Sequence, residues 1–214
     1  MLRLYDNLIS GNGYKVRLLL TQLGVAFERV ETDIFKGESR TPEFLARNPN
    51  GRIPTLRLAD GGHLAESNAI LCYLAEDSDL WPAERMARAE TLQWLFFEQY
   101  SHEPYIAVLR FWAHLPELTA QQEAQQEAER PGRKARGEEA LGVMEQHLKD
   151  RSFFVGERYG VADIALYAYT HVAEEGGFDL APYPAIRSWL ARVAAQPNHV
   201  AITAEVGQAP ADAA

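Results

Sequence analysis

Two short polar segments constrain the fold of this chain most strongly. The first, residues 48–56, places Gly51 in a turn and Pro54 directly before an alternating stretch that indicates a short strand. Because proline has no amide hydrogen to give to a sheet ladder, we expect Ile53 and Pro54 at a sheet edge or in a tight cis turn. The second, residues 66–70, begins a helix whose first backbone amides are unpaired and can bind a carboxylate.

The N-terminal part of the chain alternates between strand and helix patterns. The expected strands are 2–5, 27–30 and 55–58, and the expected helices are 14–23 and 42–45. Gly24 ends the first helix, and Asp60 to Gly62 mark a hairpin turn. This order predicts a βαβ unit with a parallel strand pair, followed by a ββα unit with an antiparallel pair.

The chain after a polar linker near residues 77–82 has helical patterns throughout. A long apolar helix over 84–115 is interrupted by Pro104, and residues 121–129 are so polar that they form either a solvated helix or a loose connection. The last residues are rich in alanine, glycine and proline, which predicts disorder. The predicted domain limits are 1–78, a linker at 79–84, a helical domain at 85–203 and a flexible tail at 204–214.

Composition excludes several classes of function. A net charge of −9 and a pI near 5.2 argue against a nucleic-acid partner, because phosphate neutralisation requires a basic face. The single cysteine excludes a disulfide framework and favours a reducing cytoplasm. We expect no membrane span and no export, since the sequence has neither an apolar run of about 18 residues nor a signal-like N-terminus.

Taken in order, these motifs resemble the cytosolic glutathione transferase superfamily. The matching residues are Asn-Pro-x-Gly-x-Ile-Pro at 48–54 and Glu-Ser at 66–67. The resemblance extends from residue 2 to a helix that begins near residues 159–163, and the chain is similar to bacterial, serine-type, theta/nu/beta-like members. It implies an α+β thioredoxin-like N-terminal domain (βαβ-ββα, with a cis-proline) and an all-α C-terminal helical bundle domain. It also implies glutathione as co-substrate, no metal, and a homodimer.

The resemblance assigns the chemistry to the loop between the first strand and the first helix. Ser10 matches the serine that donates a hydrogen bond to the glutathione thiolate, and Asn12 is the candidate second donor. Such a bond contributes about 1.5–3 kcal/mol, which lowers a thiol pKa from about 8.5 by roughly one to two units. The alternative for Ser10 is an ordinary loop or helix-capping role. Tyr5 is the rival, as in tyrosine-type members, although its place in the strand alternation favours a packed side chain.

The resemblance also assigns the glutathione contacts. The backbone of Ile53, before Pro54, pairs with the cysteinyl part of glutathione as an added strand would. Ser67 holds the γ-glutamyl carboxylate and Glu66 faces its ammonium group. Two arginines are placed to meet the glycyl carboxylate, with plain surface charge as the alternative: Arg40 and Arg52.

The second substrate site is less well defined by sequence. We expect most aromatic residues of the long helix to lie in the core, and three side chains with polar ends are the candidates for lining the electrophile pocket: His102, Tyr105 and Arg110. His102 is equally consistent with a helix cap or a satisfied core histidine. Cys72 lies among apolar neighbours and is expected to be a buried structural thiol. Gly160 replaces the hydroxyl residue of the family's capping box, of which Asp163 remains.

The leading functional hypothesis is conjugation of the glutathione thiolate to a small hydrophobic electrophile. The alternatives are glutathione-dependent disulfide or peroxide reduction, and a non-catalytic interaction or stress-regulatory role. The aromatic helix 84–115 also predicts the homodimer, with four charged residues facing a partner: Arg85, Arg88, Glu90 and Glu98. The alternative is that its apolar stripe is the core of a monomer.

Overall fold

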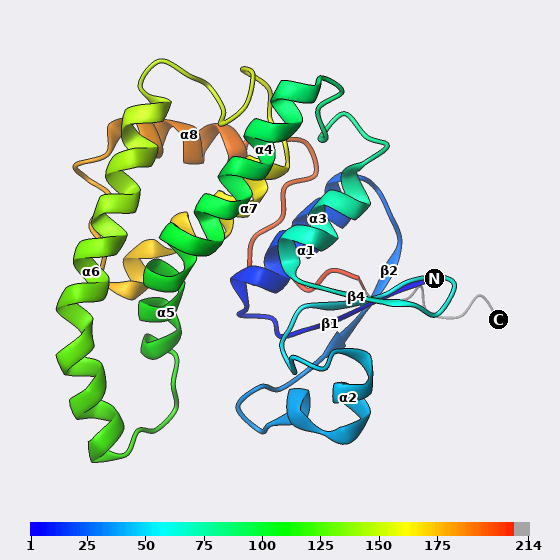
Figure 1. Ribbon diagram of the computed structural model, residues 1–214, viewed down its shortest axis with the longest axis vertical. Coiled ribbons are helices and arrows are strands. Elements are labelled where there is room, and N and C mark those ends of the chain that lie inside the picture. Colours follow the sequence, from blue (N-terminus) through cyan, green and yellow to red (C-terminus); the bar gives the residue numbers. More distant parts are fainter. Residues whose placement is uncertain (208–214) are drawn as a thin grey trace. The chain divides into compact units, whose positions relative to one another are not determined.

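The computed structural model describes residues 1–207 and divides into two compact units (Figure 1). The first comprises Met1–Trp81 together with residues 196–207, and the second is Pro82–Ala195. Residues 196–203 thus lie with the first unit and not with the helical region to which the sequence pattern assigned them. The flexible tail predicted from Ala204 includes residues 208–214, which lie outside the described residues.

A four-stranded sheet of order β2-β1-β3-β4 forms the centre of the first unit. Strand β1 (Leu2–Asp6) pairs in parallel with β2 (Phe27–Glu31) and antiparallel with β3 (Thr55–Arg57). Strand β4 (His63–Ala65) then pairs antiparallel with β3. The expected parallel first pair and antiparallel second pair are confirmed.

Helices α1 (Gly11–Gln22) and α3 (Ser67–Ala75) pack against each other beside this sheet. Six fully or almost fully buried apolar residues from the helices and strands form the core: Leu4, Val16, Leu20, Phe27, Leu56 and Ile70. Helix α1 begins at Gly11, earlier than the expected start near Tyr14, because Ser10 caps its N-terminus. Asn12 and Gly13 are therefore helical and not part of a loop.

The turn before β3 has the predicted geometry. The Ile53–Pro54 peptide bond is cis, and Gly51 has a φ of +61°, which glycine adopts without strain. The amide of Asn48 braces the turn by donating to the carbonyl of Arg52 at 2.8 Å. A short 3₁₀ helix, η1 (Glu38–Arg40), and α2 (Pro42–Arg47) precede this turn. This turn is therefore directly followed by β3, which begins at Thr55.

The second unit is helical. Its elements are α4 (Arg85–Phe97), the π-helical η2 (Glu98–His102), α5 (Glu103–Ala113), α6 (Ala120–Leu148), α7 (Val161–Thr170), the 3₁₀ helix η3 (Ala173–Gly176) and α8 (Pro184–Ala194). Pro104 lies in the first turn of α5, where its missing amide hydrogen costs no helical bond. Residues 121–129 are helical and mostly exposed, so the solvated-helix alternative is the correct one.

Helix α7 is buried along its whole length and belongs to the core of the second unit. Asp163 in its first turn accepts from Trp189 Nε1 at 2.8 Å and from the backbone amide of Phe154 at 3.1 Å. Its other carboxylate oxygen accepts from the Gly160 amide at 3.0 Å. Glycine at the cap therefore leaves the aspartate half of the capping box in place. Within residues 1–207, no helix combines the length and the apolar character needed to cross a membrane.

Candidate active site

Ser10 lies half-buried at the N-cap of α1, where its Oγ accepts from the Gly13 amide at 3.1 Å. This bond occupies an oxygen lone pair and leaves the hydroxyl hydrogen to serve as a donor. The first turn of α1 contains no acidic residue that would offset the partial positive charge of the helix N-terminus. Capping and donation to an anion are therefore compatible roles of the same hydroxyl.

Packing of α1 against α3 brings the capped helix end to Ser67. The Ser67 hydroxyl, which is 5% exposed, donates to Asn12 Oδ1 at 3.1 Å. Lys15 Nζ approaches the same hydroxyl at 3.2 Å and Asn68 Oδ1 at 3.3 Å. The structure thus joins four side chains near the starts of two helices, of which the sequence analysis had named Asn12 and Ser67 as site residues but not Lys15 or Asn68.

Glu66 precedes α3 with an exposed side chain and φ +67°, ψ 111°. Positive φ is uncommon for a residue with a Cβ and costs of order 1–3 kcal/mol. The bend between β4 and α3 holds this conformation. Such backbone outliers gather at binding sites, which is consistent with a contact role for Glu66.

The remaining glutathione candidates of the first unit surround the turn at residues 48–54. Ile53 is half-buried next to the buried Pro54, and Arg52 is exposed. Arg40 is also exposed, and its Nη1 donates to the carbonyl of Asn50 at 3.0 Å. Arg40 therefore braces the turn in addition to offering a cation beside it.

Tyr5, the rival catalytic residue, is 5% exposed within β1. Its ring packs edge-on against Phe44 with centroids 6.0 Å apart, and the Arg47 guanidinium lies 4.6 Å from the ring centroid. These contacts identify Tyr5 as a packed strand residue, as the alternation indicated.

The three electrophile-pocket candidates lie in the second unit. His102 is fully buried, with Nε2 2.9 Å from Thr170 Oγ1, which matches the core-histidine alternative. Arg110 is 6% exposed and donates through Nε to Glu175 at 2.7 Å. Tyr105 is half-buried. Two of the three are therefore engaged in contacts inside the helical unit.

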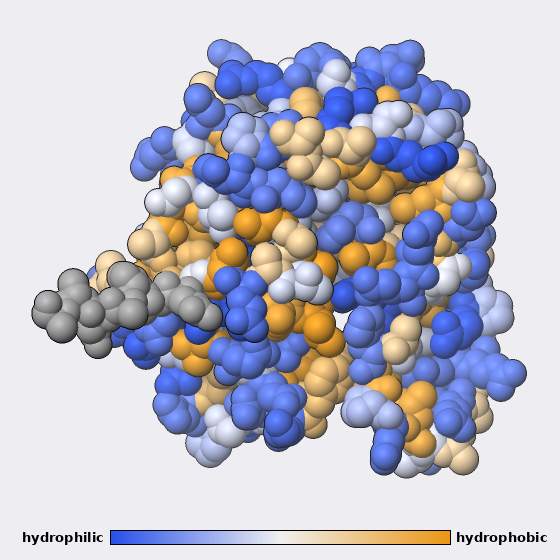
Figure 2. All heavy atoms as spheres, turned by 180° about the vertical axis from the view of Figure 1, so that it is seen from behind, coloured by the Kyte–Doolittle hydropathy of each residue, from blue (hydrophilic) through white to orange (hydrophobic). Residues whose placement is uncertain are grey.

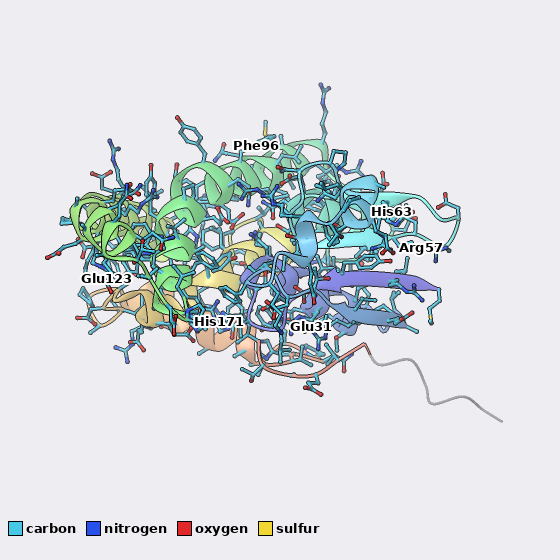
Figure 3. The ribbon with its side chains drawn as sticks, turned by 90° about the horizontal axis from the view of Figure 1, so that it is seen from below. Glu31, Arg57, His63, Phe96, Glu123 and His171 are labelled. Atoms are coloured by element: carbon cyan, nitrogen blue, oxygen red, sulfur yellow. The ribbon has the colours of Figure 1, made fainter. Side chains whose placement is uncertain are left out.

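The expectation that most aromatic residues of the long helix are core residues is wrong. Phe96 is 71% exposed on α4 (Figure 3), Tyr100 is 84% exposed and Phe111 is 41% exposed. For Phe96 the physical reason is that α4 buries only one stripe, at Thr91, Trp94 and Leu95. Glu98 is fully buried, so it is not among the charged residues able to face a partner.

Cys72 is only half-buried on α3, less than expected, and partial burial raises the pKa of its thiol. A raised pKa reduces the thiolate fraction near neutral pH, which agrees with a structural role. Among residues 1–207, no group of three or more histidine, cysteine, aspartate or glutamate side chains is arranged to hold a metal ion.

Comparison with known proteins matches both units to one family. The family model for "Glutathione S-transferase, N-terminal domain" matches residues 9–77, and that for "Glutathione S-transferase, C-terminal domain" matches residues 90–197. A crystal structure of glutathione S-transferase from Pseudomonas fluorescens is 50% identical, with a TM-score of 0.88, covering 94% of this chain and 98% of that one.

Two further relatives are informative. A glutathione transferase from Burkholderia graminis, solved with two glutathione molecules bound per subunit, is 30% identical with a TM-score of 0.78 and covers 92% of this chain and 85% of that one. Disulfide-bond oxidoreductase YfcG of Escherichia coli (strain K12) is 32% identical over 213 residues, which cover 94% of this chain and 95% of the relative. The chain therefore belongs to the glutathione S-transferase family, with a thioredoxin-like N-terminal domain and a helical C-terminal domain.

Proposed function

We propose that this protein conjugates the thiolate of glutathione to a small hydrophobic electrophile, with Ser10 as the donor that stabilises the thiolate. The observation that carries the proposal is the position of the Ser10 hydroxyl at the N-terminus of α1, with its oxygen fixed by the Gly13 amide. Asn12, in the first turn of α1, supplies a second donor. Both the hydroxyl and the helix end favour an anionic sulfur over a neutral thiol.

Glutathione binds, in this proposal, along the same unit. Ser67 and the amides at the start of α3 hold the γ-glutamyl carboxylate, and Glu66 faces its ammonium group. The backbone of Ile53 pairs with the cysteinyl part, and Arg52 and Arg40 meet the glycyl carboxylate. Ser67→Ala should weaken glutathione binding by about 1–3 kcal/mol, because a charge-assisted hydrogen bond is lost. Titration calorimetry that finds unchanged affinity would remove Ser67 from the site.

The Ser10→Ala variant tests the catalytic assignment. It should lower turnover about tenfold or more and raise the thiol pKa of bound glutathione by roughly one to two units, with affinity nearly intact. Ultraviolet titration of the bound thiolate measures the pKa directly. Tyr5→Phe is the matched control and should leave the pKa unchanged. The opposite pattern would make this a tyrosine-type enzyme.

The second candidate is glutathione-dependent reduction of disulfides or peroxides. Two observations favour it: one relative carries the name disulfide-bond oxidoreductase, and another was solved with two glutathione molecules per subunit. The raised pKa of Cys72 counts against a thiolate of the protein itself. In this alternative, one glutathione thiolate attacks the disulfide, and a second releases the thiol product as oxidised glutathione forms.

Product analysis separates the two reactions. The enzyme is given glutathione with either an aryl halide or a small symmetrical disulfide, and the products are separated by chromatography. Accumulation of the conjugate in the aryl halide reaction supports transfer. If the aryl halide stays intact and oxidised glutathione accumulates in the disulfide reaction, the result supports reduction. A non-catalytic role would give neither product above the uncatalysed rate. Against that role stand the site residues that remain in place: Ser10, Ile53, Pro54, Glu66 and Ser67.

We further propose a cytoplasmic homodimer. Four large apolar side chains are exposed along α4 and η2: Met86, Leu92, Phe96 and Tyr100. By contrast, the face in Figure 2 is mainly hydrophilic, with smaller hydrophobic areas between. Exposed aromatic residues in a row are typical of interfaces. The single cysteine supports a reducing compartment.

Sedimentation equilibrium at micromolar concentration tests the dimer. The expected mass is twice the chain mass of 24.0 kDa. Phe96→Glu should shift the protein toward the monomer, because it places a charge within the apolar row. Gln93→Glu adds the same charge at another exposed position of α4 and should leave the mass unchanged. A wild-type mass near that of one chain would refute the dimer.

A further inference from the structure

The C-terminal segment, residues 196–207, is bound closely to the rest of the first unit. The Arg29 amide, on β2, donates to the carbonyl of Gly207 at 2.7 Å, and Val206 packs against the apolar core. Gly207 also lies against the Phe27 ring, since a Cβ added to Gly207 would lie 2.2 Å from Phe27 Cε2. The segment is therefore a fixed part of the unit that carries the candidate active site.

The Arg17 side chain, which is fully buried on α1, connects this segment to the loop before Ser10. Its Nη1 donates to the carbonyl of Ile202 at 2.9 Å. Its Nη2 donates to the carbonyl of Leu8, two residues before Ser10, at 2.7 Å. Its Nε lies 2.8 Å from Asp6 Oδ2, at the end of β1. One guanidinium group therefore contacts three separate parts of the chain.

The planar guanidinium group makes these contacts depend on one another. Its N–H donors have fixed relative directions, so a shift of one acceptor changes the alignment of the others. If the C-terminal carbonyls moved away, Arg17 would keep buried N–H groups without acceptors, a cost that favours movement of the side chain. Leu8 and Asp6 would then lose their fixed partner. Asp6 lies against Gly13, whose amide donates to Ser10 Oγ, so the disturbance would reach both sides of Ser10.

We propose that Arg17 is a positioning residue for Ser10, and that residues 196–207 hold Arg17 in the place where it does this. The inference rests on the proposed function, since it takes Ser10 as the donor to the glutathione thiolate. The C-terminal segment then determines how well the Ser10 hydroxyl is directed at the sulfur, and it does so without having to contact glutathione.

The variants Gly207→Ala and Gly24→Ala form a matched pair that tests the segment. Both glycines have positive φ, +79° and +65°, so alanine strains the backbone at each. Only at Gly207 does the added Cβ also collide with a side chain, that of Phe27, whereas at Gly24 it meets nothing within 4 Å. Ultraviolet titration should therefore show the thiol pKa of bound glutathione rising by roughly one unit in Gly207→Ala alone. Affinity for S-methylglutathione, which has no thiol, should stay nearly unchanged in both variants.

Arg17→Lys tests the arginine itself. Lysine keeps the positive charge beside Asp6 but lacks the planar fork, so a similar rise of the thiol pKa would reflect lost positioning and not lost charge. In a Ser10→Ala background, neither Gly207→Ala nor Arg17→Lys should raise the thiol pKa further. An unchanged thiol pKa in either single variant, or additive rises on top of Ser10→Ala, would overturn the inference. If Gly207→Ala does not fold, Gly207→Asn adds the same Cβ in a residue that tolerates positive φ.

Failure of the proposed function gives a different result. If Ser10→Ala itself left the thiol pKa unchanged, Ser10 would not be the donor and the proposed function would be refuted. If Ser10→Ala raised the thiol pKa while Gly207→Ala and Arg17→Lys did not, only the positioning role would be refuted.

Discussion

In Gly13→Ala, the gain in helix propensity opposes the loss of space beside Asp6. Gly13 lies inside α1, where alanine is preferred over glycine by about 1 kcal/mol. However, a Cβ at this position would lie 1.5 Å from Asp6 Oδ1 and 2.1 Å from its Cγ. The Asp6 carboxylate is fully buried, with Oδ2 2.8 Å from Arg17 Nε, so it cannot move without breaking that ion pair. Helix propensity therefore predicts that Gly13→Ala raises the free energy of unfolding, whereas packing predicts that it lowers it.

The magnitude follows from the packing. Overpacking a buried site costs about 1–3 kcal/mol, and separating a buried ion pair costs about 3–5 kcal/mol. After the gain in helix propensity, the free energy of unfolding should fall by about 3 kcal/mol or more. For a chain of this size, the melting temperature should drop by about 5–12 °C. Urea denaturation followed by circular dichroism measures the first quantity, and calorimetry the second.

Two other glycines provide matched controls for Gly13→Ala. Gly132 and Gly142 both lie in α6, and a Cβ at either would meet nothing within 4 Å. Alanine at each should raise the free energy of unfolding by up to about 1 kcal/mol. If Gly13→Ala were to stabilise the protein as these controls do, the close approach of Gly13 to Asp6 would be refuted.

Three further predictions concern stability. Asp163→Ala should lower the free energy of unfolding by about 3–5 kcal/mol in urea titrations, because two buried N–H groups and one partly buried N–H group lose their acceptor. Burial raises the pKa of Asp163 to about 7, against those hydrogen bonds, so the folded chain holds a proton that the unfolded chain releases and stability should fall as pH rises from about 4 to about 7. Asp163→Asn should reduce that dependence, and Asp6, whose pKa burial also raises to about 7, should account for the remainder. Glu66→Gly should raise the free energy of unfolding by about 1 kcal/mol by relieving the positive φ, while weakening glutathione binding in calorimetry.

Much of the first unit could be predicted because its signals are local. Turn residues such as Gly51 and Pro54 act on their own backbone, and strand alternation needs only a few neighbours. The start of α1 was placed too late because Ser10, Asn12 and Gly13 have the composition of a loop. What the composition does not show is that Ser10 satisfies the Gly13 amide and so extends the helix.

The C-terminal segment could not be predicted, because its contacts join residues far apart in the chain. The Tyr14 hydroxyl donates to the carbonyl of Val200 at 2.7 Å, and Arg17 Nη1 donates to that of Ile202 at 2.9 Å. Farther along, the Arg29 amide donates to the carbonyl of Gly207 at 2.7 Å. Alanine and glycine in this segment suggest disorder, but backbone carbonyls can pair with any donor that the fold brings near.

The buried charged residues of α1 show why the site is harder to predict from the sequence than the fold. A helical pattern places Lys15 and Arg17 toward solvent, yet both are fully buried, because α1 is covered on several sides. Lys15 reaches α3, whereas Arg17 binds Asp6 and donates through Nη2 to the carbonyl of Leu8 at 2.7 Å. Buried charges of this kind contribute little net stability but fix their neighbours in one arrangement. Arg17 therefore holds the loop that carries Ser10 and Lys15 ties α1 to α3, although hydrophobic patterning alone would assign both cations to the surface.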